Sequence, residues 1–357
     1  MSSKKVTVVG AGIIGASIAW HLTEAGAEVT LISSERGGVA TPRSFAWINA
    51  SWGNSHAYFG FRARAMQEWK RLAAAVPAIP YTECGGICWD LPPEQLKAYA
   101  EEHAGWGYDI RTVTREEIAR MEPHLADLPQ FALHAAGEAA ADPLATAQAL
   151  IDGAKAKGAK LLEETVLSLD MENGRIIGLA TSEGNHETDE IILAAGVGAV
   201  SLAATAGITL PVKSPPGLLV HSKPTGKILN GLVIGEKAHI RQTGDGRIVA
   251  GSDFGGTDPG TEPDKAAAEL FQTVQAMLPG AGLELDHYTV GYRPTPKDGL
   301  PIIGPTSCEG LYVAVMHSGV TLAPLVGKLV AAEVLAEPQD ELLAPYRLSR
   351  FASIADA

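Results

Sequence analysis

Cysteine is scarce in this chain: its 357 residues include only Cys84, Cys88 and Cys308. A low and odd number argues against a disulfide framework and favours a reducing compartment. Cys84 and Cys88 have a CxxxC spacing inside an apolar run, with no histidine close to them in the sequence. We therefore expect buried side chains on a strand there, and no metal site.

Basic residues are also in short supply. The 28 Lys and Arg residues are outnumbered by 41 Asp and Glu residues, the formal net charge is −13, and no Lys/Arg cluster is present. Nucleic-acid-binding proteins normally carry a basic stripe, so we expect no nucleic-acid partner. Low-complexity tracts are absent as well. A composition of 46% hydrophobic and 19% charged residues predicts a packed globular protein, and the length suits two domains.

Long apolar runs exist in two places, but neither reads as a membrane signal. Residues 1–20 combine a basic start with an apolar run, yet their glycines have the spacing of a dinucleotide-binding motif. Residues 191–212 carry no charge, but glycines and Pro211 interrupt them. A buried strand, a glycine turn and a short helix explain that segment better than a bilayer span. We expect a cytoplasmic protein without a membrane span.

A glycine motif near the N-terminus is the first strong signal that is present. Gly10, Gly12 and Gly15 stand as G-x-G-x-x-G between an apolar strand and a helical pattern that includes Ile13 and Ile14. The first glycine allows a tight turn, the second lets a pyrophosphate approach the backbone, and the third lets the helix pack closely on the strand. The helix N-terminus attracts the phosphates. This strand–turn–helix context predicts a dinucleotide site on a parallel sheet.

The end of the second predicted strand, residues 29–32, leaves the identity of the dinucleotide open. A carboxylate normally holds a ribose hydroxyl at this point, but the sequence reads Ser33, Ser34, Glu35 and Arg36. Small hydroxyl residues followed by an arginine favour a 2′-phosphate and therefore NADP. Arg36 is explained equally well as a solvated loop charge. From the residues alone, NAD, NADP and FAD all remain open.

The rest of the chain alternates between helical and strand patterns. Residues 57–75 have helical spacing, and Asp142 and Pro143 are typical of an N-cap and a first helical position. Turns of the kind found in hairpins occur at residues 172–175 and 243–247. These patterns predict an α/β fold: a Rossmann-like domain with a parallel sheet and an α+β substrate domain with a mainly antiparallel sheet. The expected nucleotide-binding domain is discontinuous, with residues 1–77, 145–210 and 289–357, and the expected substrate domain contains residues 78–144 and 211–288.

A series of motifs in a fixed order runs along nearly the whole chain. They are VVGAGIIGASIAWHL, GVATPRSFAWIN, DPLATAQAL, ETVLSL, IILAAGVGA, GYRPTPKDGLPIIG and MHSGVTLAPLVGKLVAAEVL. In this order the sequence resembles the D-amino-acid oxidase family of flavoproteins, which includes glycine oxidase and sarcosine oxidase. The resemblance implies FAD as the cofactor. Ser33 then makes the ribose contact, through a neutral and weaker hydrogen bond than a carboxylate would make, and Arg36 becomes a loop charge.

The resemblance also implies which residues contact FAD. Thr41, Arg43 and Ser44 offer donors to phosphate and ribityl oxygens, although Arg43 would also suit a surface loop. The backbone of Val166 matches the position that holds the adenine, and is otherwise an ordinary strand valine. The expected cofactor contacts are Gly10, Gly12, Ile13, Ile14, Gly15, Ser33, Ser34, Thr41, Arg43, Ser44, Ala46, Trp47, Val166, Ala195, Gly196, Arg293, Gly319, Val320, Thr321 and Leu322.

The C-terminal motif implies a helix that begins at Gly319 and points its N-terminus at the flavin. Its backbone N–H groups and dipole would stabilise the negative charge of reduced flavin, a feature that a nicotinamide enzyme does not need. His317 either lines the flavin pocket or serves as a structural residue in the turn. Val290 stands where sarcosine oxidases have the cysteine that links to flavin, so non-covalent FAD is expected.

Two arginines are candidates for substrate contact. In amino-acid oxidases an arginine at the position of Arg293 binds the substrate carboxylate; the alternative here is an internal salt bridge, for example to Asp298. Arg241 and its neighbour His239 are weaker candidates for the pocket wall, with a solvated sheet edge as the alternative. Residues 248–251 stand where sarcosine oxidases have a lysine that promotes reaction with oxygen, which favours another acceptor.

The resemblance implies an FAD-dependent amino-acid or amine oxidase or dehydrogenase. In that chemistry a hydride passes from the substrate α-carbon to flavin N5, and the resulting imine hydrolyses; Arg293 and His317 are the expected catalytic-site residues. The partners would be a small amine or amino-acid substrate and either oxygen or an electron carrier. Two alternatives remain: an NADP-dependent reductase, suggested by Ser33, Ser34 and Arg36, and a flavin-binding subunit or sensor without turnover of its own.

Overall fold

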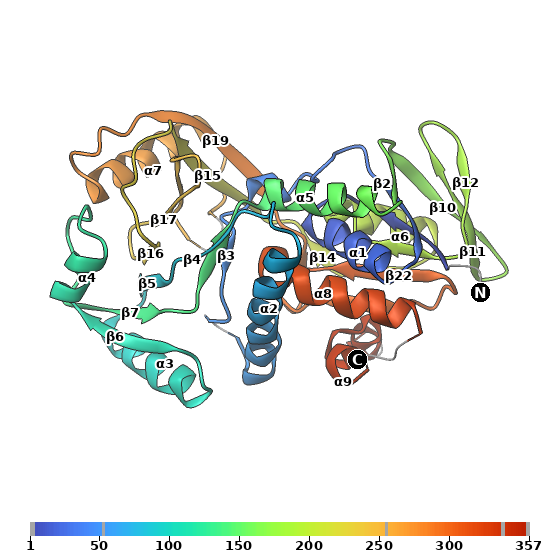
Figure 1. Cartoon of the computed structure of the whole chain (residues 1–357), viewed down its shortest axis with the longest axis horizontal. Helices are drawn as coiled ribbons and strands as arrows, with labels where there is room; N and C mark the ends of the chain where they lie inside the picture. Colours follow the sequence, from blue (N-terminus) through green and yellow to red (C-terminus); the bar gives the residue numbers. More distant parts are fainter. Residues whose placement is uncertain (1–3, 52–53, 254–255, 337–339, 355–357) are drawn as a thin grey trace.

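The computed structural model describes residues 4–51, 54–253, 256–336 and 340–354. Two large sheets lie at opposite ends of the molecule, with a long helix and a small three-stranded sheet between them (Figure 1). The small sheet has the order β3 (Trp47–Ile48), β8 (Ala139–Ala141), β4 (Tyr81–Glu83), and the long helix is α2 (His56–Ala75). This arrangement confirms the α/β prediction.

The first large sheet is six-stranded and mostly parallel, in the order β21-β22-β13-β1-β2-β9. Only β21 runs antiparallel to its neighbour. The strands are β1 (Lys5–Val9), β2 (Glu28–Ile32), β9 (Lys160–Leu162), β13 (Ile191–Leu193), β21 (Ile302–Pro305) and β22 (Leu311–Val315). The residues of the interior strands β1, β13 and β22 are almost continuously buried because both faces of the sheet are covered, as parallel sheets require.

One face of this sheet packs against three helices, α1 (Ile13–Glu24), α5 (Pro143–Ala156) and α8 (Gly319–Val334). Val6 and Val8 point into that core. The other face points Val9 toward α6 (Ala199–Thr205) and a three-stranded antiparallel sheet. The strands of this second three-stranded sheet are β10 (Val166–Glu172), β11 (Arg175–Thr181) and β12 (Asn185–Glu187).

The ends of these helices agree with the sequence signals. Helix α1 ends at the C-cap Ala25, and Gly26 follows with a φ of 85°. In α5 the N-cap Asp142 accepts a hydrogen bond from the Ala145 N–H at 2.9 Å, and Pro143 occupies the first helical position. The uncharged segment 191–212 contains β13, a 3-10 turn (Gly196–Gly198) and α6, as predicted.

Helix α8 carries Pro324, which has no N–H to donate to the Val320 carbonyl one turn earlier. The indole of Trp69, from α2, supplies the missing donor: its Nε1–H points at the carbonyl oxygens of Val320 (3.0 Å) and Thr321 (3.1 Å). Trp69 is completely buried. Helix α2 therefore supports the first turns of α8.

The second large sheet is eight-stranded, in the order β19-β15-β18-β17-β16-β5-β7-β6, and helix α7 (Pro263–Met277) packs on it. All neighbours are antiparallel except β16 and β5. The strands are β5 (Gly86–Trp89), β6 (Ile110–Thr114), β7 (Phe131–Ala135), β15 (Pro216–Ser222), β16 (Leu232–Gly235), β17 (His239–Gln242), β18 (Ile248–Gly251) and β19 (Leu285–Tyr292). Strand β19 runs across residue 288, where the sequence placed a domain boundary.

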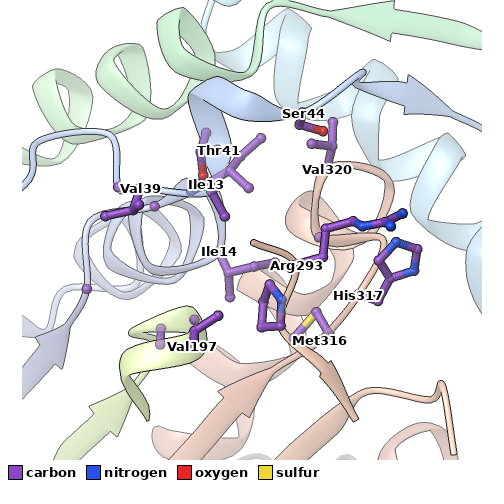
Figure 2. A pocket seen from close by; sticks show the side chains of 18 of the residues that line it. Ile13, Ile14, Val39, Thr41, Ser44, Val197, Arg293, Met316, His317 and Val320 are labelled. Atoms are coloured by element: carbon purple, nitrogen blue, oxygen red, sulfur yellow. Dashed lines mark hydrogen bonds between the residues drawn. The ribbon is translucent and has the colours of Figure 1, made fainter. Parts of the chain in front are cut away.

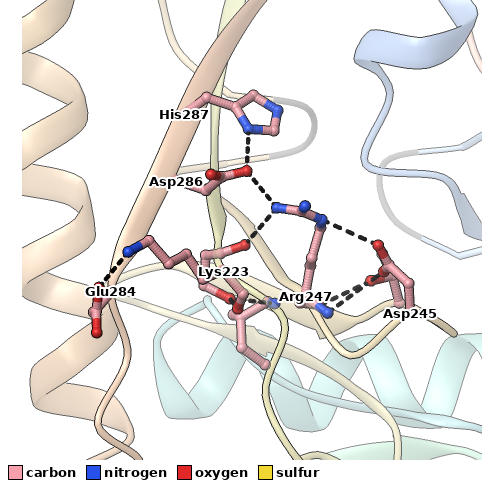
Figure 3. A network of polar contacts seen from close by, with 9 residues as sticks. Lys223, Asp245, Arg247, Glu284, Asp286 and His287 are labelled. Carbon is pink, nitrogen blue, oxygen red and sulfur yellow. Dashed lines mark hydrogen bonds and ion pairs between the residues drawn. The ribbon is translucent and has the colours of Figure 1, made fainter.

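Strand β19 is an edge strand, and charged side chains cover its start (Figure 3). Arg247 pairs with Asp286 and with Asp245 (3.0 Å), and Lys223 pairs with Glu284 at 2.6 Å. Exposed ion pairs of this kind contribute little to stability. Charges on an edge strand do, however, discourage pairing with a second chain.

Candidate functional site

A cavity of about 680 Å³ opens at the carboxyl ends of the parallel strands. Its wall is formed by the loops that follow β1, β2, β13 and β22, by the first turns of α1 and α8, and by the segment after β19 (Figure 2). Ligands of open parallel sheets bind at this edge, because the loops there converge and helix N-termini face them. The location matches the dinucleotide site predicted from the glycine motif.

Most of the predicted site residues, distant in sequence, come together on this wall. They are Gly10, Gly12, Ile13, Ile14, Ser33, Ser34, Thr41, Arg43, Ser44, Ala46, Trp47, Val166, Ala195, Gly196, Arg293, His317, Gly319, Val320 and Thr321.

Two of the predicted contacts lie behind the wall instead. A Cβ atom on Gly15 would overlap the carbonyl oxygen of Gly10, so this glycine serves helix–strand packing. Leu322 is fully buried, and its N–H donates to the carbonyl of Ser318 at 3.1 Å. That amide begins the hydrogen-bond ladder of α8, and the preceding three residues line the cavity whereas Leu322 does not.

The N-terminus of α1 has room for a diphosphate. Its N-cap, Gly12, has no side-chain cap, and the Ile13 N–H donates to the Thr41 hydroxyl at 3.0 Å. A Cβ atom on Gly12 would meet only the Thr41 hydroxyl, at 3.2 Å, and the distant Gly38 backbone. A Cβ atom on Gly10 would overlap the Ala194 backbone. Gly10 is therefore required by the fold, whereas Gly12 keeps the cavity open.

The end of the cavity beside β2 contains both candidates for a ribose contact. Ser33 and Glu35 line the wall, and the Ser33 hydroxyl donates to the Glu35 carbonyl (3.2 Å) and accepts from the Glu35 N–H (3.3 Å). The choice of Ser33 over Glu35 as the ribose contact stays a prediction. Arg36 is exposed, lies off the wall and pairs with Asp152 at 2.5 Å, which supports its interpretation as a loop charge.

Large apolar side chains are exposed on this wall. Val39 is 58% exposed, Tyr292 is 53% exposed and Val197 is 36% exposed, and all three face the cavity. Apolar surface of this extent usually marks a binding site. A flat ring system bound in the cavity would cover it.

The opposite end of the cavity carries positive charge. Arg293 and His317 lie beside each other there (Figure 2). Burial, with the nearby charges of Arg293 and Arg62, lowers the pKa of His317 to about 4, so the imidazole is neutral at neutral pH. The predicted alternative partner of Arg293 is wrong: Asp298 pairs with Arg350, at 2.7 Å.

Arg62 is a wall residue that the sequence interpretation missed. It is 5% exposed and lies on the buried face of α2, where it donates to the Asn49 carbonyl (3.1 Å), the Asn49 side chain (2.8 Å) and the Ser318 hydroxyl (2.6 Å). Ser318 is the N-cap of α8, so Arg62 ties α2 to the start of that helix. The sequence signal that could have identified Arg62 is its position within the apolar stripe of a predicted helix, where a charged side chain needs partners inside the fold.

Arg241 and His239 do not line the cavity. Both are buried on β17, and Arg241 Nε donates to the carbonyl of Phe45, a wall residue that stands between them and the cavity. Burial lowers the pKa of Arg241 to about 10. Neither a wall position nor a solvated edge describes these residues, so both expectations were wrong. Their place is behind the wall.

Other expected features can be located as well. None of Cys84, Cys88 and Cys308 lines the cavity, and the described residues hold no group of three His, Cys, Asp or Glu side chains placed to bind a metal ion. Residues 248–251 form β18, an interior strand of the eight-stranded sheet. Within the described ranges, no helix has the length and apolarity needed to cross a membrane.

The fold and the cavity together define a protein that binds a dinucleotide cofactor at the carboxyl edge of a Rossmann-like sheet, next to a separate antiparallel sheet. Residues 5–333 match the model of the DAO family, described as FAD dependent oxidoreductase, and the chain belongs to that family. The resemblance inferred from the motifs is thereby confirmed. FAD is the cofactor of the family, so the NADP alternative raised by Ser33, Ser34 and Arg36 is wrong.

Individual relatives span the full chain. The uncharacterized oxidoreductase YurR of Bacillus subtilis is 28% identical over 376 residues, covering 96% of this chain and 98% of that protein. Glycine oxidase of Pseudomonas aeruginosa is 28% identical over 355 residues, covering 92% and 94%. Among solved structures, L-proline dehydrogenase from P. horikoshii is 26% identical with a TM-score of 0.85, covering 98% of each chain.

Proposed function

We propose that this FAD-dependent oxidoreductase oxidises the C–N bond of an amino acid or a related amine that carries a carboxylate. The observation that carries this proposal is Arg293, whose guanidinium lies in the cavity wall beside the start of α8. Relatives named glycine oxidase and L-proline dehydrogenase support the substrate class. Bound FAD would supply the chemistry by accepting a hydride from the carbon next to the substrate nitrogen.

The cavity residues fit FAD. The N-terminus of α1 and the hydroxyl of Thr41 would hold the diphosphate, since the dipole and backbone N–H groups of a helix N-terminus attract anions. The loop from Ser33 to Glu35 would hold the adenosine ribose. The start of α8 has no side-chain cap, so its N–H groups are left to stabilise negative charge on the flavin ring. With no cysteine on the wall and valine at position 290, we propose that FAD is bound non-covalently.

The chain's own groups would orient and desolvate the substrate. Arg293 would bind the carboxylate, because a guanidinium fork matches its two oxygens. The pKa of His317 is lowered to about 4, so its imidazole is neutral at neutral pH and adds no charge beside Arg293. No side chain is required as a base if the amine binds in its neutral form. We propose oxygen or an electron carrier as the acceptor. Residues 248–251 stand where sarcosine oxidases have the lysine that promotes reaction with oxygen, and the absence of a lysine there favours the carrier.

The test starts with purified protein containing FAD. Under anaerobic conditions, a panel of D- and L-amino acids, glycine and N-alkyl glycines is added, and loss of the visible flavin absorbance identifies substrates. Arg293→Ala should raise KM by about 100-fold, because truncating one partner of a buried charge pair costs about 2–5 kcal/mol. Arg36→Ala, outside the cavity, is the matched control. An unchanged KM in Arg293→Ala removes the carboxylate anchor.

A second outcome would change the function itself. If the wild-type protein binds FAD but no compound in the panel bleaches it, the oxidase or dehydrogenase proposal fails. A flavin-binding subunit or sensor would then be favoured.

A further inference from the structure

One fully enclosed carboxylate lies directly behind the cavity wall. Glu138 is 2% exposed, and three side-chain donors converge on it. Trp47 Nε1–H donates to Oε2 at 2.7 Å, while the Ser51 and Tyr108 hydroxyls donate to Oε1, each at 2.8 Å. Trp47 and Ser51 themselves line the cavity. A single carboxylate thus holds two residues of the wall.

The location of Glu138 joins separate parts of the fold. It lies between β7, a strand of the eight-stranded sheet, and β8, which pairs with β3 of the small sheet. Tyr108 precedes β6, and its hydroxyl also receives the Ala50 N–H at 3.4 Å. At Gly86, in β5, a Cβ atom would overlap Oε2 of Glu138, so the absence of a side chain makes room for the carboxylate.

The partners of Glu138 are suited to an ionised carboxylate. An indole N–H can only donate, so Oε2 must accept from Trp47. The Tyr108 oxygen already accepts from Ala50, which directs its proton toward Glu138. Among the described residues, no cation forms an ion pair with Glu138. The positive charge of Arg62, on the wall, also favours the ionised form of Glu138.

We propose that Glu138 is a positioning residue: its carboxylate fixes Trp47 and Ser51 in the cavity wall, and its charge makes the environment of the bound flavin depend on pH near neutrality. The idea concerns the cavity of the proposed function, but the flavin can be observed without turnover. Removal of the acceptor would take away the hydrogen bond that the Trp47 indole donates to Glu138. Removal of the charge alone would leave the positive charge of Arg62 uncompensated.

Burial raises the pKa of Glu138 to about 7, against hydrogen bonds that favour its ionised form. The other titratable or charged groups near it are Arg62 of α2, Cys84 before β5, Cys88 in β5 and Tyr108. Burial raises the pKa of both cysteines and of Tyr108, so these three stay protonated at neutral pH. Of the groups whose pKa is shifted here, Glu138 is the one that changes charge between pH 6 and 8.

The experiment compares three variants with the wild-type holoenzyme. Glu138→Gln keeps an oxygen for Trp47 and an amide that can donate to the two hydroxyls, but it has no charge. Glu138→Leu removes every partner. Glu122→Gln is the control: Glu122 is also 2% exposed and accepts backbone N–H groups of Asn230 and Gly231, neither of which lines the cavity.

The readouts are the affinity of the apoprotein for FAD and the visible absorbance and fluorescence of bound flavin from pH 6 to 8. In the wild type, we expect a spectral transition near neutrality. Glu138→Gln should lose this transition and bind FAD with an affinity close to that of the wild type. Glu138→Leu should bind FAD about tenfold or more weakly, as expected when a buried hydrogen-bonded network loses its acceptor. Glu122→Gln should behave as the wild type in both.

Three results would overturn the proposal. One is the same transition in Glu138→Gln as in the wild type, and another is wild-type FAD affinity and flavin spectra in Glu138→Leu. The third is a Glu122→Gln variant that reproduces the changes, since any buried carboxylate would then have the effect. If no compound bleaches the flavin, the proposed function fails, yet these readouts still decide the role of Glu138.

Discussion

The hydrogen bond from Trp69 to α8 leads to a quantitative prediction. In Trp69→Phe the indole N–H is lost, and the Val320 carbonyl, which faces Pro324, loses its donor. An unsatisfied buried carbonyl costs about 1–3 kcal/mol. The smaller ring removes further buried carbon surface from a fully enclosed site, which adds about 1–2 kcal/mol. We expect Trp69→Phe to lower the free energy of unfolding by about 2–5 kcal/mol.

A second substitution separates the two contributions. In Pro324→Ala the new backbone N–H can donate to the Val320 carbonyl within the helix, so Trp69 is no longer the only donor that this oxygen needs. Trp69→Phe should then cost less in the Pro324→Ala background, by about 1–2 kcal/mol. Unfolding in urea, followed by circular dichroism, measures all four variants. Trp20→Phe, in α1, controls for loss of ring volume at a partly buried tryptophan.

The reasoning would be refuted by additivity. If Trp69→Phe costs the same in both backgrounds, to within about 0.5 kcal/mol, the indole is not acting as the donor that proline removed. Binding of FAD gives an independent check, because the supported turn of α8 lies on the cavity wall. A loss of FAD affinity in Trp69→Phe that Pro324→Ala reverses would agree with the hydrogen-bond argument.

Two further predictions concern glycine packing and pH. Gly12→Ala should fold normally but bind FAD at least about tenfold more weakly. Gly15→Ala should fail to give stable protein, because its Cβ would overlap the Gly10 carbonyl. Thermal unfolding and FAD titration distinguish the two variants, and equal behaviour would contradict the separate roles of Gly12 in the cavity and Gly15 in helix–strand packing. Burial lowers the pKa of His21 to about 4 from 6.5, so the unfolded chain binds more protons between these values, and stability should fall by up to about 3 kcal/mol as pH drops from 6.5 to 4. His21→Gln should lose this part of the acid dependence in urea titrations at pH 7 and 4.5, and an unaltered dependence would assign it to other groups.

Features of the molecule that depend on neighbouring residues could be predicted from the sequence. The turn at Gly10, the cap at Asp142 and the start of α8 at Gly319 all follow from local rules. Each rests on hydrogen bonds and backbone angles within a few residues. The order of the motifs led to the DAO family and FAD, which in turn excluded the NADP interpretation of the serines at 33 and 34.

Contacts between distant residues were not accessible in this way. Arg241 was a candidate for the pocket wall because it lies on an expected strand of the substrate domain, but its guanidinium reaches the Phe45 carbonyl, 196 positions away. Asp298 lies five positions after Arg293, yet it pairs with Arg350, 52 positions away. Proximity along the chain was therefore a poor guide to the partners of buried charges.

By itself, the sequence determined the class of fold, the cofactor and most of the residues that reach the cavity, because periodicity, glycine spacing and family motifs are local properties of the chain. Only the tertiary structure decided what stands behind the wall. Glu138 acquires its role from donors located 91, 87 and 30 positions away, and Arg62 from Asn49 and the N-cap of α8. A buried charge is tolerated only where such partners converge, and that convergence is a property of the folded chain.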